Sequence, residues 1–91
     1  MNRVGDVAVV MRILPEDADR DINTIMSAAK EKLKGKCTLN KVEVQDVAFG
    51  LKAVRLEIII PDEEGKIDSV EAALSGIDGV GQVDTEDMTL V

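Results

Sequence analysis

The run Val54-Arg55-Leu56-Glu57-Ile58-Ile59-Ile60-Pro61-Asp62-Glu63 decides the fold, because residues 7–17 have the same layout. That earlier run reads Val7-Ala8-Val9-Val10-Met11-Arg12-Ile13-Leu14-Pro15-Glu16-Asp17. Each run is mostly apolar and β-rich, and each ends in a Pro followed by two acidic residues. Pro cannot donate a hydrogen bond to a neighbouring strand, so it marks the strand end. The chain therefore reads as two similar halves, and each half opens with a strand.

A helical pattern follows each of these strands. The first helix is predicted from about Asp19 to Lys34, with Gly35 as its C-terminal stop. The second is predicted from Ile67 or Asp68 to Ser75, with Asp68 or Ser69 as its N-cap and Gly76 or Gly79 ending it. In the first helix the apolar residues recur at three- and four-residue spacing; they are Ile22, Ile25, Met26, Ala29 and Leu33.

Two further strands are predicted at 38–44 and 81–88, where apolar and polar residues alternate. The order is then β-α-β-β-α-β, and two right-handed βαβ units place both helices on one face of a shared sheet. The expected fold is a ferredoxin-like α/β sandwich with a four-stranded antiparallel sheet, formed by a single domain over residues 1–91. The apolar first and third strands should be central, and the charged second and fourth strands should be edges.

The second face of this sheet is left without a helix. Alternation along the central strands places a mixture of apolar and charged side chains there, and such an open face often serves as a contact surface. The candidates are Ala8, Val10, Arg12, Leu14, Arg55, Glu57 and Ile59.

Composition and charge exclude several classes of function. The 91 residues carry a formal net charge of −7, which argues against direct nucleic-acid binding. No apolar run approaches a membrane span, and the segment from Met1 to Asp6 has no export signal. With one cysteine, Cys37, an internal disulfide is impossible and a cytoplasmic location is expected.

The residues for ordinary enzymatic chemistry are also missing. Without His, and with no activator for Cys37, no nucleophile–base pair or zinc site can be assembled. The acidic clusters at 62–64 and 84–87 lack the ligand spacing of a calcium loop, so they read as a solvated turn and a solvated edge. No phosphate-binding glycine loop is present. The prediction is a protein that is not an enzyme and uses no cofactor or metal.

Phe49 is the only aromatic residue of the chain, and it precedes Gly50 at the junction of two strands. It can be a core residue, as most Phe side chains are. It can instead be an anchor for a partner's pocket, since an aromatic ring supplies much contact area at little entropic cost. A truncation experiment separates the two, because a core Phe is worth roughly 3–5 kcal/mol of stability.

The segment 46–53, read Asp-Val-Ala-Phe-Gly-Leu-Lys-Ala, resembles part of archaeal translation elongation factor 1-beta. The later Pro61-Asp62-Glu63 and the segment 74–80, Leu-Ser-Gly-Ile-Asp-Gly-Val, fit the same family, as do 5–7 and 13–16. No single piece is diagnostic, but their order and spacing cover essentially the whole chain. The resemblance implies a guanine nucleotide exchange factor for elongation factor 1-alpha, the GTPase that delivers aminoacyl-tRNA.

By the same resemblance, one end of the domain performs the exchange. The loop with Phe49 and Gly50 would dock an aromatic wedge in the GTPase, and the C-terminal segment Met88-Thr89-Leu90-Val91 would approach the Mg²⁺ and phosphate region. Lys52 is the nearest cation to the wedge, with plain solvent exposure as its alternative role.

The C-terminus departs from the family pattern. Eukaryotic relatives place a Lys near the extreme C-terminus, where its ammonium can compete with Mg²⁺, whereas this chain has no Lys or Arg between Glu86 and Val91. A lysine-for-magnesium mechanism therefore does not transfer. The terminal carboxylate, Asp87, or displacement of the GTPase switch region by Phe49 could act instead.

Two other functions fit the same fold order. One is a small-molecule regulatory domain of the ACT type, which predicts a stable dimer and ligand-dependent melting. The other is a structural subunit, which predicts binding to a larger partner without any change in nucleotide release.

Overall fold

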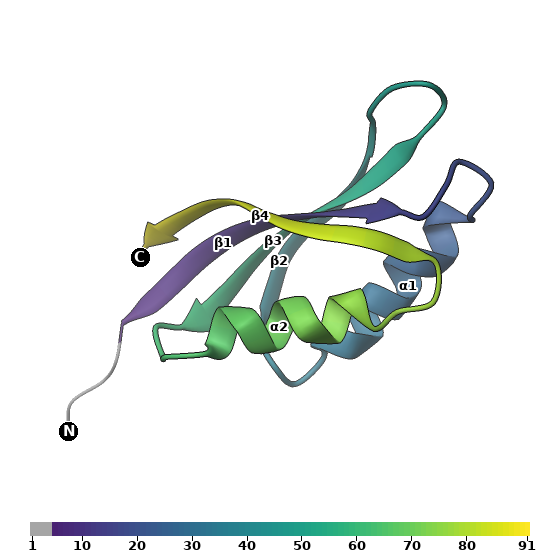
Figure 1. Ribbon diagram of the computed structural model, residues 1–91. Coiled ribbons are helices and arrows are strands. Elements are labelled where there is room, and N and C mark those ends of the chain that lie inside the picture. Colours follow the sequence, from purple (N-terminus) through teal and green to yellow (C-terminus); the bar gives the residue numbers. More distant parts are fainter. Residues whose placement is uncertain (1–4) are drawn as a thin grey trace.

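The computed structural model describes residues 5–91 and has the predicted ferredoxin-like arrangement. In chain order the elements are β1 (Asp6–Pro15), α1 (Ile22–Leu33), β2 (Thr38–Asp46), β3 (Lys52–Pro61), α2 (Lys66–Ser75) and β4 (Val80–Leu90). The sheet order is β2-β3-β1-β4, every neighbouring pair is antiparallel, and both helices lie on the same face (Figure 1). The prediction that no export signal is present concerns the segment from Met1 to Asp6. Residues 1–4 of that segment lie outside the described residues.

The central and edge positions are also as predicted. Burial alternates along β1, where Val7, Val9, Met11 and Ile13 are buried under the helices. The corresponding side chains of β3 complete the core together with apolar residues of both helices; they are Val54, Leu56, Ile58, Ile60, Ile25, Ala29, Leu33, Val70 and Leu74. This all-aliphatic core is complete without an aromatic side chain.

The open face of the sheet carries the predicted mixture of half-buried apolar and charged residues. Arg12 and Arg55 lie directly opposite each other on the two central strands. Arg55 donates to Glu57 at 2.6 Å and to Glu43 at 3.4 Å, and Arg12 lies 3.8 Å from Glu86. Acidic neighbours therefore balance the two like charges at the centre of this face.

The first helix begins later than predicted, at Ile22 rather than Asp19. Residues 17–20 form a turn in which the backbone N–H of Arg20 donates to the Asp17 carbonyl. Asp21 follows with an extended backbone, and its carboxylate accepts hydrogen bonds from the N–H of Asn23 (3.0 Å) and the hydroxyl of Thr24 (3.1 Å). The side-chain cap thus sets the helix start. Gly35, with φ 81°, follows the helix end as expected.

We expect Asp21→Ala to lower the free energy of unfolding by about 0.5–2 kcal/mol, because it leaves the first-turn donors without their acceptor. Urea unfolding followed by circular dichroism measures this. Asp19→Ala is the matched control, since Asp19 is exposed and its carboxylate accepts no hydrogen bond within residues 5–91. Equal losses for both variants would show that Asp21 is not the cap.

The predicted N-cap of the second helix, Asp68 or Ser69, is wrong. Helix α2 starts at Lys66 and is preceded by Gly65, which has φ 78° and no side chain to donate or accept. The left-handed backbone at Gly65 turns the chain into the helix, and glycine adopts it without a steric cost. Gly76, one of the two predicted stops, forms the C-cap.

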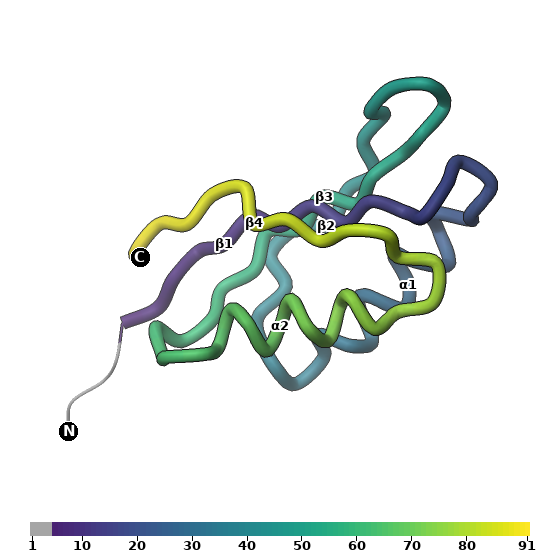
Figure 2. Tube along the Cα trace, in the orientation of Figure 1, coloured from purple at the N-terminus to yellow at the C-terminus, as the bar shows by residue number. Residues whose placement is uncertain are grey.

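The domain is long and narrow, with extents of 49 × 20 × 18 Å, and its two ends carry different features. The hairpin end holds the β2–β3 loop, the β1–α1 loop and the turn from α2 into β4. The C-terminal end holds the last residues of β4 together with the start of β1 and the end of β3. Figures 1 and 2 show the β2–β3 hairpin projecting past the rest of the sheet at the first end.

Candidate functional site

Phe49 lies at the tip of the projecting hairpin and is completely exposed, with a relative accessibility of 102%. The core alternative is therefore excluded. A ring that contacts nothing in its own chain contributes no burial to folding, and its exposure costs hydration free energy. An exposed aromatic at the tip of an arm is instead suited to a partner's pocket.

The backbone of the turn holds the ring outward. The N–H of Leu51 donates to the Ala48 carbonyl and the N–H of Val47 donates to the Leu51 carbonyl, both at 2.9 Å. Phe49 and Gly50 between them have φ of 55° and 78°. Phe49 is the only residue other than glycine with a positive φ within 5–91. A left-handed backbone costs such a residue about 1–2 kcal/mol, so the fold alone does not favour Phe at this position.

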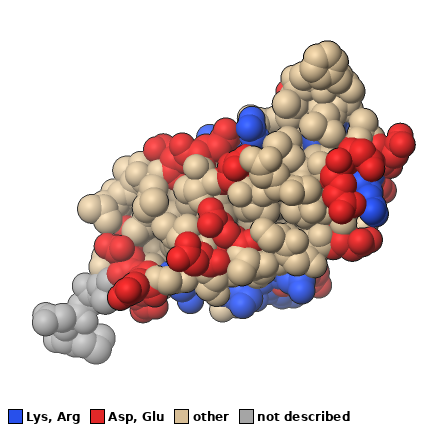
Figure 3. Space-filling model, in the orientation of Figure 1, with Lys and Arg blue, Asp and Glu red and all other residues tan. Residues whose placement is uncertain are grey.

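The projecting part of the hairpin, residues 44–52, is called the arm here. It is apolar at its tip and charged at its base. Val44 and Val47 are among the exposed large apolar residues, and Figure 3 shows the projection almost free of charged side chains. Lys52 begins β3 at the base, where its ammonium lies 3.8 Å from Asp46. Its side chain is 55% exposed, so Lys52 is available at the surface at the base of the arm.

The predicted C-terminal residues form the end of the edge strand β4. Leu90 pairs with Val7, and the N–H of Val91 donates to the Asp6 carbonyl at 3.0 Å, so the strand is held to its last residue. Residues opposite each other in antiparallel strands share a face. Met88 and Leu90 therefore lie on the face of the buried Val9 and Val7, and both are exposed beyond the helices. Asp87 and Thr89 lie on the open face.

The expectation that one end of the domain carries both elements is wrong. Met88 is opposite Val9 on β1, whereas Val54 is opposite Ile13 and Phe49 lies five residues before Val54. At about 3.3 Å per residue, the tip of the arm and the C-terminal segment are more than about 20 Å apart. Phe49, Gly50 and Lys52 form one cluster, and Asp87 to Val91 form a second at the opposite end (Figure 2).

One feature of the hairpin end was missed in the sequence. A cavity of about 260 Å³ lies between the arm and the β1–α1 loop, and it is lined by Pro15, Ala18, Arg20, Asp21 and Ile22 on one side and by Gly50 and Lys52 on the other. The predicted topology could have pointed to this cavity. Because β1 and β3 are antiparallel, the end of β1 at Pro15 must lie beside the start of β3 at Lys52.

Within residues 5–91 no three His, Cys, Asp or Glu side chains gather in a way that could hold a metal ion. Burial raises the pKa of the Cys37 thiol, although the charge of Lys66 opposes this, and a raised pKa disfavours the reactive thiolate. None of the helices in 5–91 is long and apolar enough to cross a membrane.

Comparison with known proteins gives the family. The EF-1 guanine nucleotide exchange domain matches residues 8–91. Elongation factor 1-beta of Thermoplasma acidophilum is 46% identical over 88 residues, which are 97% of this chain and 100% of the relative. The Thermoplasma volcanium protein of the same name is 43% identical with the same coverage. The family resemblance found in the sequence is thereby confirmed.

Solved structures show the fold alone. The ACT domain from the GTP pyrophosphokinase of Chlorobium tepidum superposes with a TM-score of 0.67 at 16% identity, covering 89% of this chain and 99% of that domain. The C-terminal domain of the Mycobacterium tuberculosis MgtC protein gives a TM-score of 0.63 at 13% identity, covering 100% of this chain and 93% of that one. The β-α-β-β-α-β sandwich is thus shared with these two domains, but the function of this chain follows from the family match. The chain belongs to the EF-1 guanine nucleotide exchange domain family and is a nucleotide exchange factor of translation elongation.

Proposed function

We propose that this chain acts on elongation factor 1-alpha and that Phe49 is its anchor on that GTPase. The observation that carries the proposal is that the only aromatic residue stands fully exposed on a projecting arm, in a backbone conformation that is costly for Phe. Phe49 destabilises its own fold and makes no contact with the core. The simplest explanation for a Phe at this position is contact with another molecule.

Exchange requires only non-covalent work. The exchange factor speeds GDP release and allows GTP to reload if it binds the nucleotide-free GTPase more tightly than the GDP-bound form, because only a difference in affinity shifts that equilibrium. No nucleophile, metal ion or cofactor of this chain takes part. The proposed activity is therefore not enzymatic in the sense of making or breaking covalent bonds.

The two clusters imply two separate contacts on the GTPase. If the C-terminal segment approaches the Mg²⁺ and phosphate region, Phe49 must anchor more than about 20 Å away from it. The groups that would then disturb the Mg²⁺ and phosphate contacts are Asp87, Thr89 or the terminal carboxylate. Met88, Leu90 and Val91 would make apolar contacts with the GTPase. A long domain can bind the GTPase at both ends. Phe49 would hold it at one point of the GTPase, while the C-terminal segment disturbs the bound nucleotide at another.

The surface charge fits a protein partner rather than a nucleic acid. The net charge is −7, and acidic side chains are spread over the face seen in Figure 3. Such a surface repels phosphate backbones and favours encounter with basic protein surfaces. We propose that the chain binds the GTPase in the cytoplasm without contacting tRNA directly or associating with a membrane, as one domain over residues 1–91.

The proposal is tested by measuring the affinity of this chain for elongation factor 1-alpha with GDP bound and after removal of the nucleotide, by isothermal titration calorimetry. Tighter binding to the nucleotide-free form is expected, and equal affinities would contradict an exchange function and favour a structural subunit. Melting of the chain alone with and without free amino acids tests the ACT alternative, for which a ligand-dependent shift is the expected sign.

A further inference from the structure

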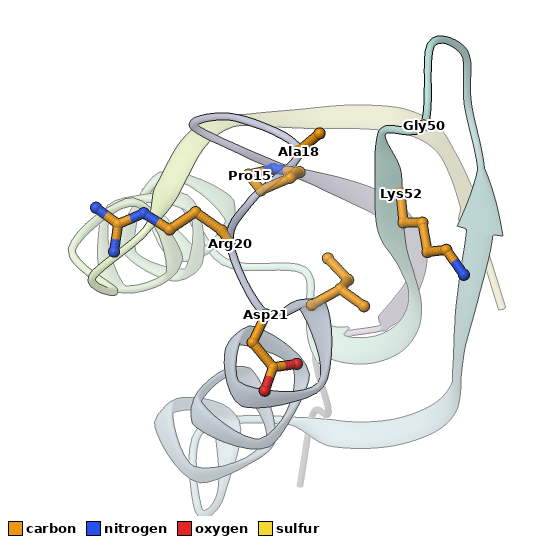
Figure 4. Close-up of a pocket in the computed structure, with 7 residues that line it drawn as sticks. Pro15, Ala18, Arg20, Asp21, Gly50 and Lys52 are labelled. Carbon is orange, nitrogen blue, oxygen red and sulfur yellow. The ribbon is translucent and has the colours of Figure 1, made fainter.

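The cavity at the hairpin end is an open cleft between two walls that come from different parts of the chain. The end of β1 supplies Pro15, the β1–α1 loop supplies Ala18, Arg20 and Asp21, the start of α1 supplies Ile22, and the arm supplies Gly50 and Lys52 (Figure 4). The cleft adjoins the arm that carries Phe49, so it forms one continuous surface with the proposed anchor.

The loop wall is held in place by contacts within the chain. Arg20 donates to Glu16 at 2.7 Å and lies 3.5 Å from Asp78, while the N–H of Glu16 donates to the Gly79 carbonyl at 2.8 Å. These contacts join the β1–α1 loop to the turn before β4. The Gly81 backbone also packs so closely that a side-chain carbon there would lie 2.9 Å from the Pro15 carbonyl oxygen. A preformed wall lowers the entropic cost of receiving a partner group.

The chemistry of the cleft favours an apolar occupant over an anion. Arg20 is engaged by two carboxylates and Lys52 by Asp46. Figure 4 shows the charged ends of Arg20 and Lys52 pointing in opposite directions, away from the space between Ala18 and Gly50. The first-turn N–H of Asn23 on α1 is bonded to the Asp21 carboxylate. Asp21 also lines the cleft, and its carboxylate is bonded at the start of α1 to Asn23 and Thr24. The remaining side chains of the lining, those of Pro15, Ala18 and Ile22, are apolar.

The size of the cleft favours a protein side chain over a free small molecule. Its volume of about 260 Å³ is below the ~300–1,000 Å³ of typical small-molecule sites. One large aliphatic or aromatic side chain from a neighbouring protein surface is a suitable occupant, because the rest of that surface would close the open side.

We propose that this cleft receives an apolar side chain of the same GTPase that accepts Phe49. The inference rests on the proposed function, and it makes the contact at the hairpin end reciprocal: the arm inserts a ring into the partner, and the partner inserts a side chain beside the arm. Anchors that pair with a pocket on each side are typical of the centres of tight protein interfaces.

The test is Ala18→Phe, which fills the cleft from an exposed position of the loop. We expect about tenfold weaker binding to nucleotide-free elongation factor 1-alpha in calorimetry, as for loss of a well-packed interface contact. Ala72→Phe is the matched control, because Ala72 is also exposed but lies on α2, outside the cleft. Melting of each variant alone verifies that both remain folded.

The outcomes separate this inference from the function on which it rests. If the unaltered chain and Ala72→Phe bind alike and Ala18→Phe binds weakly while still folded, the cleft is occupied in the complex. If Ala18→Phe binds as well as Ala72→Phe, the cleft proposal is overturned and the exchange function stands. If the unaltered chain fails to bind the GTPase, the function and the cleft proposal fall together.

Discussion

Replacing Phe49 with Asn should make the protein more stable and abolish most of its exchange activity. Phe49 and Gly50 occupy the two central positions of a tight hairpin turn, and both have positive φ. Asn-Gly is the pair that such turns favour, since Asn tolerates the left-handed conformation that burdens Phe. No buried contact is lost, because the ring is fully exposed. We expect a gain of up to about 1 kcal/mol in the free energy of unfolding.

The effect on exchange should be opposite in sign and larger. Loss of an aromatic anchor at the centre of an interface costs about 2 kcal/mol or more, which corresponds to roughly thirtyfold in affinity. Chemical denaturation and nucleotide release, measured on the same preparation, test both halves of the prediction. Phe49→Tyr keeps the ring and serves as the control, with near-normal exchange. An Asn variant that loses 3–5 kcal/mol of stability would mean that Phe49 is packed in the core after all.

The second large effect concerns the C-terminal end. Leu90→Ser should weaken binding to elongation factor 1-alpha by about tenfold without unfolding the domain, since Leu90 is 72% exposed. Combined with Phe49→Ala, the two losses in binding free energy should add to within about 0.3–0.5 kcal/mol, because independent sites more than 7–10 Å apart do not share contacts. A calorimetric double-mutant cycle measures this. Strong non-additivity would contradict the placement of two separate contacts on the GTPase.

The fold was predictable because its signals are local and repeated. Each half combines an apolar strand that ends in Pro with a periodic helix, and this order permits few topologies. The helix starts were less predictable, because they depend on caps whose alternatives are close in sequence: Asp21 rather than Asp19 for α1, and Gly65 rather than Asp68 for α2.

Candidate residues for the site could be named from the sequence, but their arrangement could not. The sequence pointed to Phe49 as the singular side chain, but whether it is buried depends on the turn geometry, which sequence composition does not determine. That Phe49 and the C-terminus lie at opposite ends follows from the strand pairing of β1 with β3 and β4. The cleft depends on the contacts of Arg20 with Glu16 and Asp78, which no periodicity signals.

The most direct test of the account is the rate at which elongation factor 1-alpha releases a fluorescent GDP analogue, measured with the unaltered chain, with Phe49→Asn and without either. The account predicts a large acceleration by the unaltered chain that the folded Asn variant loses. Full acceleration by that variant would contradict the role of Phe49 and move the exchange determinant to the C-terminal segment. No acceleration by the unaltered chain would contradict its action on this GTPase.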